Sequence, residues 1–211
     1  MWGSSPRGRQ LAITIRAAER NDALHVAALI DLAGHGIEAE FWKAKAGPDG
    51  SLLVAARQLV LADTGVPYHL SRAWLVLRDE DVAGGLIGGL VDPSDDVPTG
   101  FPDYFAPLLE LESFASGYWA VIGIAIYPEY RGQGLARELL AHAEATARAA
   151  GARGLSLVVE DANLTALSLY QSLGFEERQR RAWLAYGERG GPGEWLLLTR
   201  DMTPPQPARD E

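Results

Sequence analysis

The sequence predicts an α/β fold with one twisted, mixed sheet of about seven strands and helices on both of its faces. Its length and composition fit one globular domain, because 211 residues with 47% hydrophobic and 22% charged side chains can bury a single core. Segments with the period of a helix alternate along the chain with segments of strand character. Residues 118–127 form a nearly continuous apolar run, which indicates a central strand buried on both faces.

The first half of the chain is predicted to form a strand, helices and a β-hairpin. Residues 11–16 alternate between apolar and polar side chains, as in a half-buried strand. Apolar residues then recur at helical spacing from the capping residues Asn21 or Asp22 up to two glycines. The same patterns predict helices over 38–45 and 52–61 and the two hairpin strands over 73–78 and 82–90.

The second half is predicted to alternate between strands and helices more clearly. Glycines follow both predicted helices, where they favour the left-handed conformation that ends a helix. A Gly-Pro-Gly turn separates the last two strands. The predicted elements are a strand over 118–127, a helix over 135–150, a strand over 155–160, a helix over 163–173 and a strand pair over 182–186 and 194–199.

The predicted domain covers residues 11–200, between a flexible leader over 1–10 and a flexible tail over 201–211. The chain has no cysteine, which excludes thiol nucleophiles and thiolate metal sites, and we expect no metal cofactor. A net charge of −9 disfavours nucleic acid as a partner. No apolar run is long enough to span a membrane and no secretory signal is recognisable, so we expect a cytoplasmic protein without a membrane partner.

The most informative segment runs from Arg131 to Ala136, between the central strand and a predicted helix. A helix start carries unsatisfied N–H groups and a partial positive charge, and glycines let an anion approach its backbone. Gly132 and Gly134 supply those glycines, but the segment is neither a dinucleotide fingerprint nor a P-loop, because the third glycine and the Gly-Lys-Ser/Thr sequence are missing. A tight turn without a ligand is the alternative.

Asn163 and Tyr170 form a second candidate pair. They are seven residues apart, which is two helical turns, so they share one face of the predicted helix. Each has a structural alternative, since Asn163 is a good helix N-cap and Tyr170 a plausible core residue. Their spacing from the glycine turn, one helix plus one strand, favours a common site.

These motifs together resemble the GNAT superfamily of acyl-CoA-dependent N-acetyltransferases, over residues 119–175. The family's phosphate loop, Gln/Arg-x-x-Gly-x-Gly/Ala, is matched by Arg131, Gly134 and Ala136. Its second signature is matched by Asn163, Ala166, Leu169, Tyr170, Gly174 and Phe175. The first half of the chain shows the expected order of elements but no diagnostic residues.

The resemblance implies acetyl-CoA as the co-substrate and assigns residues to it. The backbone of Ile124, Ala125 and Ile126 would pair with the pantetheine arm, which Asn163 would also contact. Tyr170 would act as general acid, because a tyrosine can protonate a departing thiolate of comparable basicity. Arg131 would flank the cofactor, and Arg137 is either a phosphate ligand or a solvated helix residue. The pyrophosphate would lie on the N–H groups of Gln133, Gly134, Leu135, Ala136 and Arg137.

A base must also deprotonate the amine, because alkyl amines are protonated at neutral pH. The family often places a glutamate near the start of the central strand, and we therefore assign this role to Glu112. Glu110 also lies just before that strand, His35 and His69 are alternatives without a motif, and a surface carboxylate is the structural alternative for Glu112. The absence of cysteine agrees with direct attack of the amine on the thioester.

The acceptor is a small-molecule or peptide amine whose identity the sequence leaves open. Residues 91–116 carry no lysine or arginine, which would favour a cationic amine if this stretch lines the acceptor groove. Its acidic residues are Asp92, Asp95, Asp96, Asp103, Glu110 and Glu112. Two alternatives to an acetyltransferase remain: a non-catalytic acyl-CoA-binding or regulatory protein, and an α/β protein with a fortuitous turn. The resemblance also leaves a homodimer open, with the terminal strand pair as its candidate interface.

Overall fold

The computed structural model describes residues 12–62, 68–91, 100–190 and 192–202. The leader over 1–10, most of the tail and the acidic residues Asp92, Asp95 and Asp96 lie outside these residues. Within the described part, no helix is long and apolar enough to cross a bilayer.

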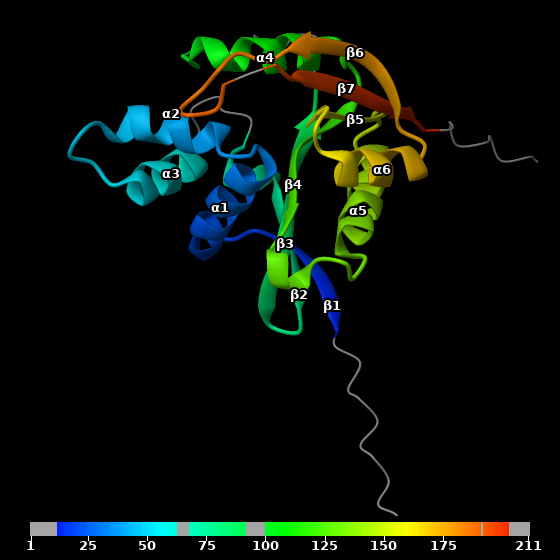
Figure 1. Ribbon diagram of the computed structural model, residues 1–211. Coiled ribbons are helices and arrows are strands. Elements are labelled where there is room, and N and C mark those ends of the chain that lie inside the picture. Colours follow the sequence, from blue (N-terminus) through cyan, green and yellow to red (C-terminus); the bar gives the residue numbers. More distant parts are fainter. Residues whose placement is uncertain (1–11, 63–67, 92–99, 191, 203–211) are drawn as a thin grey trace, which may run out of the picture.

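The described residues form one mixed sheet of seven strands, as the sequence predicts, in the order β1-β2-β3-β4-β5-β7-β6 (Figure 1). Neighbouring strands are antiparallel except for β4 and β5, which are parallel. The strands are β1 (Ile13–Ala17), β2 (Ala73–Arg78), β3 (Asp81–Leu90), β4 (Trp119–Ile126), β5 (Gly154–Glu160), β6 (Glu176–Ala182) and β7 (Glu194–Asp201).

Helices cover both faces of this sheet, which confirms the predicted architecture. Figure 1 shows α1, α2 and α3 on one side of the strands and α5 and α6 on the other. The α-helices of the described residues are α1 (Ala23–Ala33), α2 (Ile37–Ala46), α3 (Leu52–Leu61), α4 (Ala106–Ser113), α5 (Leu135–Ala149) and α6 (Leu164–Ser172).

The sheet separates two hydrophobic cores. Side chains alternate across a strand, so β7 sends Trp195 and Leu197 into the core under α1 to α4 and Leu196 and Leu198 into the core under α5 and α6. The helix α5 fits the second core because its fully buried residues, among them Leu139, recur on one face. Both cores therefore hold the central strands rigidly between the two layers of helices.

One predicted strand is wrong. The strand expected over 182–186 lies earlier, at β6 (Glu176–Ala182), and Trp183 and Tyr186 belong to the loop before β7. Nearly all of β6 is exposed. Its charged side chains form ion pairs, among them those from Arg180 to Glu177 and Glu194. An exposed edge strand needs no apolar alternation. The apolar and aromatic residues of the following loop therefore predicted a strand where the structure has none.

The parallel strands β4 and β5 separate part of the way along their length. They pair only from Trp119 opposite Leu155 to Val121 opposite Leu157. Beyond that point β4 continues beside β3 and β5 continues beside β7. The β3–β4 register shifts between Ile87 and Gly88, which leaves Ile122 as the extra residue of a β-bulge where the separation begins. The result is a gap in the sheet edged by two strand backbones.

Candidate active site

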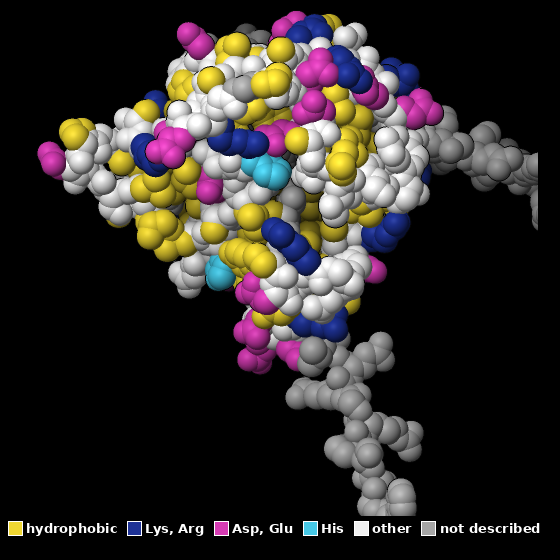
Figure 2. All heavy atoms as spheres, viewed as in Figure 1, with side chains coloured by type: hydrophobic (Ala, Val, Ile, Leu, Met, Phe, Trp, Pro, Cys, Tyr) yellow, Lys and Arg dark blue, Asp and Glu magenta, His cyan; other side chains and the backbone are white. Residues whose placement is uncertain are grey.

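A cleft of about 550 Å³ occupies the gap between β4 and β5. Its walls come from both strands, from the first turn of α5, from α6 and from the turn between α1 and α2. Figure 2 shows apolar side chains at the centre of this face, with basic and acidic side chains around them. The cleft thus collects segments from both halves of the chain, including most residues predicted from the sequence to form the site.

The glycine turn at the start of α5 has the geometry of an anion site. Gly132 and Gly134 have φ angles of 72° and 82°, a region that residues with a Cβ disfavour. Gly134 is the N-cap of α5 and no side chain caps the helix there. Among the described residues, no acceptor bonds the amides of residues 133–136. The Arg137 amide, which we predicted as a fifth donor, instead donates to the Gly134 carbonyl at 2.9 Å.

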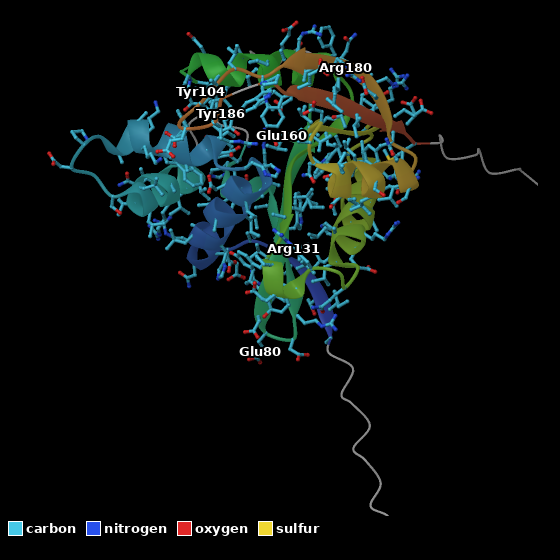
Figure 3. The ribbon with its side chains drawn as sticks, in the orientation of Figure 1. Glu80, Tyr104, Arg131, Glu160, Arg180 and Tyr186 are labelled. Carbon is cyan, nitrogen blue, oxygen red and sulfur yellow. The ribbon has the colours of Figure 1, made fainter. Side chains whose placement is uncertain are left out.

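Each of the two arginines beside this turn forms a hydrogen bond within the protein. Arg131 Nε donates to the carbonyl oxygen of Ile126 at 3.2 Å, which ties the turn to the end of β4. Arg137 Nη2 donates to Ser172 Oγ at 2.8 Å and so links α5 to α6. Figure 3 shows Arg131 well below Glu160, and both residues line the cleft. Both side chains are exposed, so each retains donors for a ligand while it fixes the local structure.

The backbone of Ile124, Ala125 and Ile126 lines the cleft as predicted. On one edge these residues pair with Gly84 to Leu86 of β3. On the other edge they have no strand partner among the described residues, because the pairing of β4 with β5 ends at Val121. A strand edge of this kind offers amide and carbonyl groups to an extended ligand that carries amides of its own.

Asn163 is the N-cap of α6 and also lines the cleft. Its Oδ1 accepts the Ala166 amide at 3.2 Å, so it is the N-cap of α6. Its Nδ2 lies 3.3 Å from Nε2 of His35, which reaches the cleft from the turn between α1 and α2. The contact joins the two walls of the cleft across its width.

Tyr170 lines the cleft from α6 and is 7% exposed. Its ring packs against Phe175 with centroids 5.7 Å apart, within the core under α5 and α6. Burial raises the pKa of Tyr170 to about 12, so its hydroxyl is protonated at neutral pH. The side chain therefore presents a proton donor in an apolar setting.

The structure does not place Glu112 among the residues that line the cleft. It belongs to α4, where burial raises its pKa to about 7. Its charge in turn raises the pKa of Glu38 of α2. Of the alternatives, Glu110 is exposed and pairs with Arg181 at 2.7 Å, and His69 bonds Ser71. Only His35 reaches the cleft.

Sequence reasoning missed Glu160, the last residue of β5. It is 8% exposed, lines the cleft and is held by Arg189 of the β6–β7 loop at 2.7 and 3.3 Å. Arg189 also donates to the Tyr186 hydroxyl at 2.8 Å, and Figure 3 shows Glu160 below Tyr186. A glutamate that ends an otherwise apolar strand was a usable signal, but its partner Arg189 lies in a loop without a recognisable pattern.

Comparisons with known proteins bear on the family and the fold. The model of the Acetyltransferase (GNAT) family matches residues 37–175. YycN of Bacillus subtilis (strain 168), described as an uncharacterized N-acetyltransferase, is 42% identical over 57 residues, which are 27% of this chain and only 36% of YycN. An N-acetyltransferase from Staphylococcus aureus Mu50 has a similar structure, with a TM-score of 0.63 at 19% identity over 89% of this chain and 100% of that one. The ribosomal-protein-S18-alanine N-acetyltransferase from Escherichia coli has a TM-score of 0.56 at 21% identity, over 95% and 100%.

Proposed function

Because this chain belongs to the GNAT acetyltransferase family, we propose that it is an N-acetyltransferase that moves an acetyl group from acetyl-CoA directly to a primary amine. The observation that carries the proposal is one continuous cleft, which joins unbonded amides at a helix start, a free strand edge and a buried tyrosine. A phosphate group, an amide-bearing arm and a leaving group each find a matching partner there.

The residues present fit acetyl-CoA. The amides of residues 133–136 are the proposed pyrophosphate ligands, since positive-φ glycines expose them and the dipole of α5 favours an anion. The free edge of residues 124–126 is the proposed partner of the pantetheine arm, with Asn163 on the opposite wall. Acetyl-CoA supplies the acetyl group as an activated thioester.

Tyr170 and Glu112 are the proposed proton-transfer residues. Tyr170 Oη holds a proton at neutral pH and lies in the cleft, so it can give that proton to a departing thiolate. Glu112 is the proposed acceptor of the proton that the amine loses, because burial raises its pKa to about 7, near the pH at which a base works best. As Glu112 does not line the cleft, its proton must arrive through an intervening group or water.

Calorimetric titration with acetyl-CoA tests the proposal. We expect saturable binding, and at 100 times the dissociation constant the ligand should stabilise the fold by about 2.7 kcal/mol. A panel of primary amines is then assayed for acetyl-CoA-dependent release of CoA. No saturable binding would rule out both an acetyltransferase and a non-catalytic acyl-CoA binder. Binding without CoA release from any amine would instead favour the non-catalytic binder.

A further inference from the structure

Glu160 is the only carboxylate among the described residues that line the cleft. It is the last residue of β5, and its side chain is buried. Figure 3 shows it well above Arg131, so it lies apart from the glycine turn that is proposed to bind the pyrophosphate. Its charge therefore acts on a ligand in a different part of the cleft.

The side chain of Glu160 belongs to the face of the sheet under α1 to α4. Side chains alternate along β5, since Val159 packs in the core under α5 and α6 and Val158 packs against the core under α1 to α4. Glu160 continues this alternation, opposite Trp195 in the register of β5 and β7. Tyr170 belongs to the other core. The cleft thus receives the tyrosine from one face of the sheet and a carboxylate from the other.

Arg189, in the loop between β6 and β7, fixes the Glu160 carboxylate without lining the cleft itself. Its Nη1 and Nη2 donate to Oε1 and Oε2 of Glu160 at 2.7 and 3.3 Å. The guanidinium lies over the rings of Trp183 and Tyr186, 5.1 and 5.6 Å from their centroids. Two backbone hydrogen bonds between Tyr186 and Arg189 close the turn that carries it. The guanidinium is therefore held in place before any ligand binds.

Glu160 is also held through its backbone, and its carboxylate keeps acceptor capacity for a ligand. Its carbonyl accepts the Asn163 amide at 3.0 Å, and the following amide, that of Asp161, donates to the Glu194 carbonyl at 3.0 Å. A carboxylate has about four lone-pair positions, of which Arg189 occupies two. Because Glu160 lines the cleft and Arg189 does not, the remaining positions can serve a ligand there.

The ion pair has consequences for an amine in this part of the cleft. An amine attacks a thioester through the lone pair of its nitrogen, which the protonated form lacks. A carboxylate without a counterion would favour that protonated form, because an opposite charge nearby raises the pKa of an amine. Arg189 offsets the charge of Glu160 but leaves lone pairs on its oxygens. The pair can therefore accept a hydrogen bond from an amine without strongly favouring the ammonium form.

We propose that Glu160 binds the nitrogen of the acceptor amine in the cleft, and that Arg189 is a positioning residue that holds the carboxylate and limits its preference for ammonium. The acceptor is then a primary amine that enters from the α1–α4 face of the sheet, opposite Tyr170. This inference rests on the proposed function, because it assigns a residue to the acceptor of that reaction.

Calorimetric titration with two CoA thioethers tests the role of Glu160 without knowledge of the acceptor. S-(2-aminoethyl)-CoA carries an ammonium group beyond the sulfur, and S-propyl-CoA has a methyl group in its place. Wild type should bind the amine about fivefold or more tightly than the propyl compound, since a hydrogen bond to a charged group favours it. Glu160→Gln keeps the size of the side chain and should bind both within about twofold. The control Glu80→Gln removes an exposed carboxylate at the β2–β3 turn, far below Glu160 in Figure 3, and should keep the wild-type preference.

Arg189→Gln distinguishes the proposal from a purely structural role of the ion pair. If the pair only held the β6–β7 loop in place, both variants would lose the same preference. We expect the opposite, because the charge of Glu160 is no longer offset: the preference for the amine should rise about threefold or more above wild type. Thermal melting of each variant checks that the fold is intact.

Equal binding of the two thioethers by wild type would overturn the proposal, and this comparison holds even if a variant does not fold. An unchanged preference in Glu160→Gln, or the same loss of preference in both variants, would overturn it as well. If wild type binds neither thioether nor acetyl-CoA, the proposed function fails. Acetyl-CoA binding together with equal thioether affinities would leave the proposed function standing and remove only the role of Glu160.

Discussion

The two sides of the cleft are built from different chemical groups. The α5–α6 side presents backbone amides at a glycine turn and one buried tyrosine, and the two arginines beside the turn are bonded to neighbouring segments. Behind the side formed by α1, α2 and α4, outside the lining of the cleft, lie Glu38 and Glu112, whose pKa values burial raises to about 8 and about 7. One side therefore has the groups of an anion site, whereas the other covers acids that favour their neutral form, a difference that the net charge of −9 does not show.

The difference matters because backbone and side-chain sites respond differently to substitution. A turn that binds through its amides depends on φ angles, so side chains within it can vary while its glycines cannot. The pKa of a carboxylate depends on that one group and on what surrounds it. Substitutions on the two sides should thus separate cofactor binding, chemistry and the pH dependence of stability.

The largest effect is expected from Tyr170→Phe on the α5–α6 side. The variant keeps the ring that packs against Phe175 and removes only the hydroxyl that is proposed to donate a proton. We expect kcat to fall by about 100-fold or more, with the Kd for acetyl-CoA within about threefold of wild type. Steady-state kinetics and calorimetry measure the two quantities.

An unchanged kcat in Tyr170→Phe would remove the hydroxyl from the chemistry. A parallel loss of acetyl-CoA affinity would mean that the tyrosine binds cofactor, and the α5–α6 side would then depend on a side chain as much as on its backbone. Thermal melting serves as the control, since a buried ring that stays in place should keep the midpoint close to wild type.

A smaller effect is expected from Gly134→Ala, compared with Gln133→Ala in the same turn. Alanine at a φ of 82° costs about 1–2 kcal/mol, and no neighbouring atom would clash with its methyl group, so the change acts on backbone conformation alone. We expect about a tenfold rise in the Kd for acetyl-CoA. The side chain of Gln133 makes only a 3.5 Å contact with the Glu129 carbonyl, so its removal should change Kd less than twofold.

If Gln133→Ala weakens cofactor binding as much as Gly134→Ala, side chains rather than amides hold the phosphates. The contrast between the two sides of the cleft would then fail in its central point. Both variants need to be titrated at the same ionic strength, because salt screens the attraction between an exposed helix start and an anion.

The same contrast explains how far the sequence could predict the site. The glycine turn was predictable because a φ of 72° or 82° constrains the residue type at Gly132 and Gly134, and the constraint is local. Strands in the core were predictable from their apolar runs, whereas the exposed edge strand β6 was not, because nothing apolar marks it. Glu38 had no local signal at all: its unusual environment arises only when α1, α2 and α4 meet in the fold.

The smallest effect expected concerns stability, and it tests the environment of Glu38 and Glu112 without any ligand. Burial raises the pKa of Glu38 to about 8 and that of Glu112 to about 7, from an ordinary value near 4.5 in the unfolded chain. The folded state therefore binds these protons more tightly than the unfolded state does. Their contribution to stability is complete below pH 4.5 and is lost progressively as the pH rises from 4.5 to the folded pKa, about 7 for Glu112 and about 8 for Glu38.

Each such carboxylate should lower the free energy of unfolding by about 1.4 kcal/mol per pH unit within its window. Burial lowers the pKa of His142, which gives the opposite slope below pH 6.5, so the comparison belongs between pH 6.5 and 8. Urea unfolding at several pH values should show the slope in wild type and in the control Glu80→Gln, which removes an exposed carboxylate at the β2–β3 turn (Figure 3). Glu38→Gln should reduce it, since glutamine resembles the protonated acid, and adding Glu112→Gln should reduce it further. An equal slope in all four proteins would show that the two carboxylates are as well solvated as those on the surface, and the contrast between the two sides of the cleft would lose its electrostatic basis.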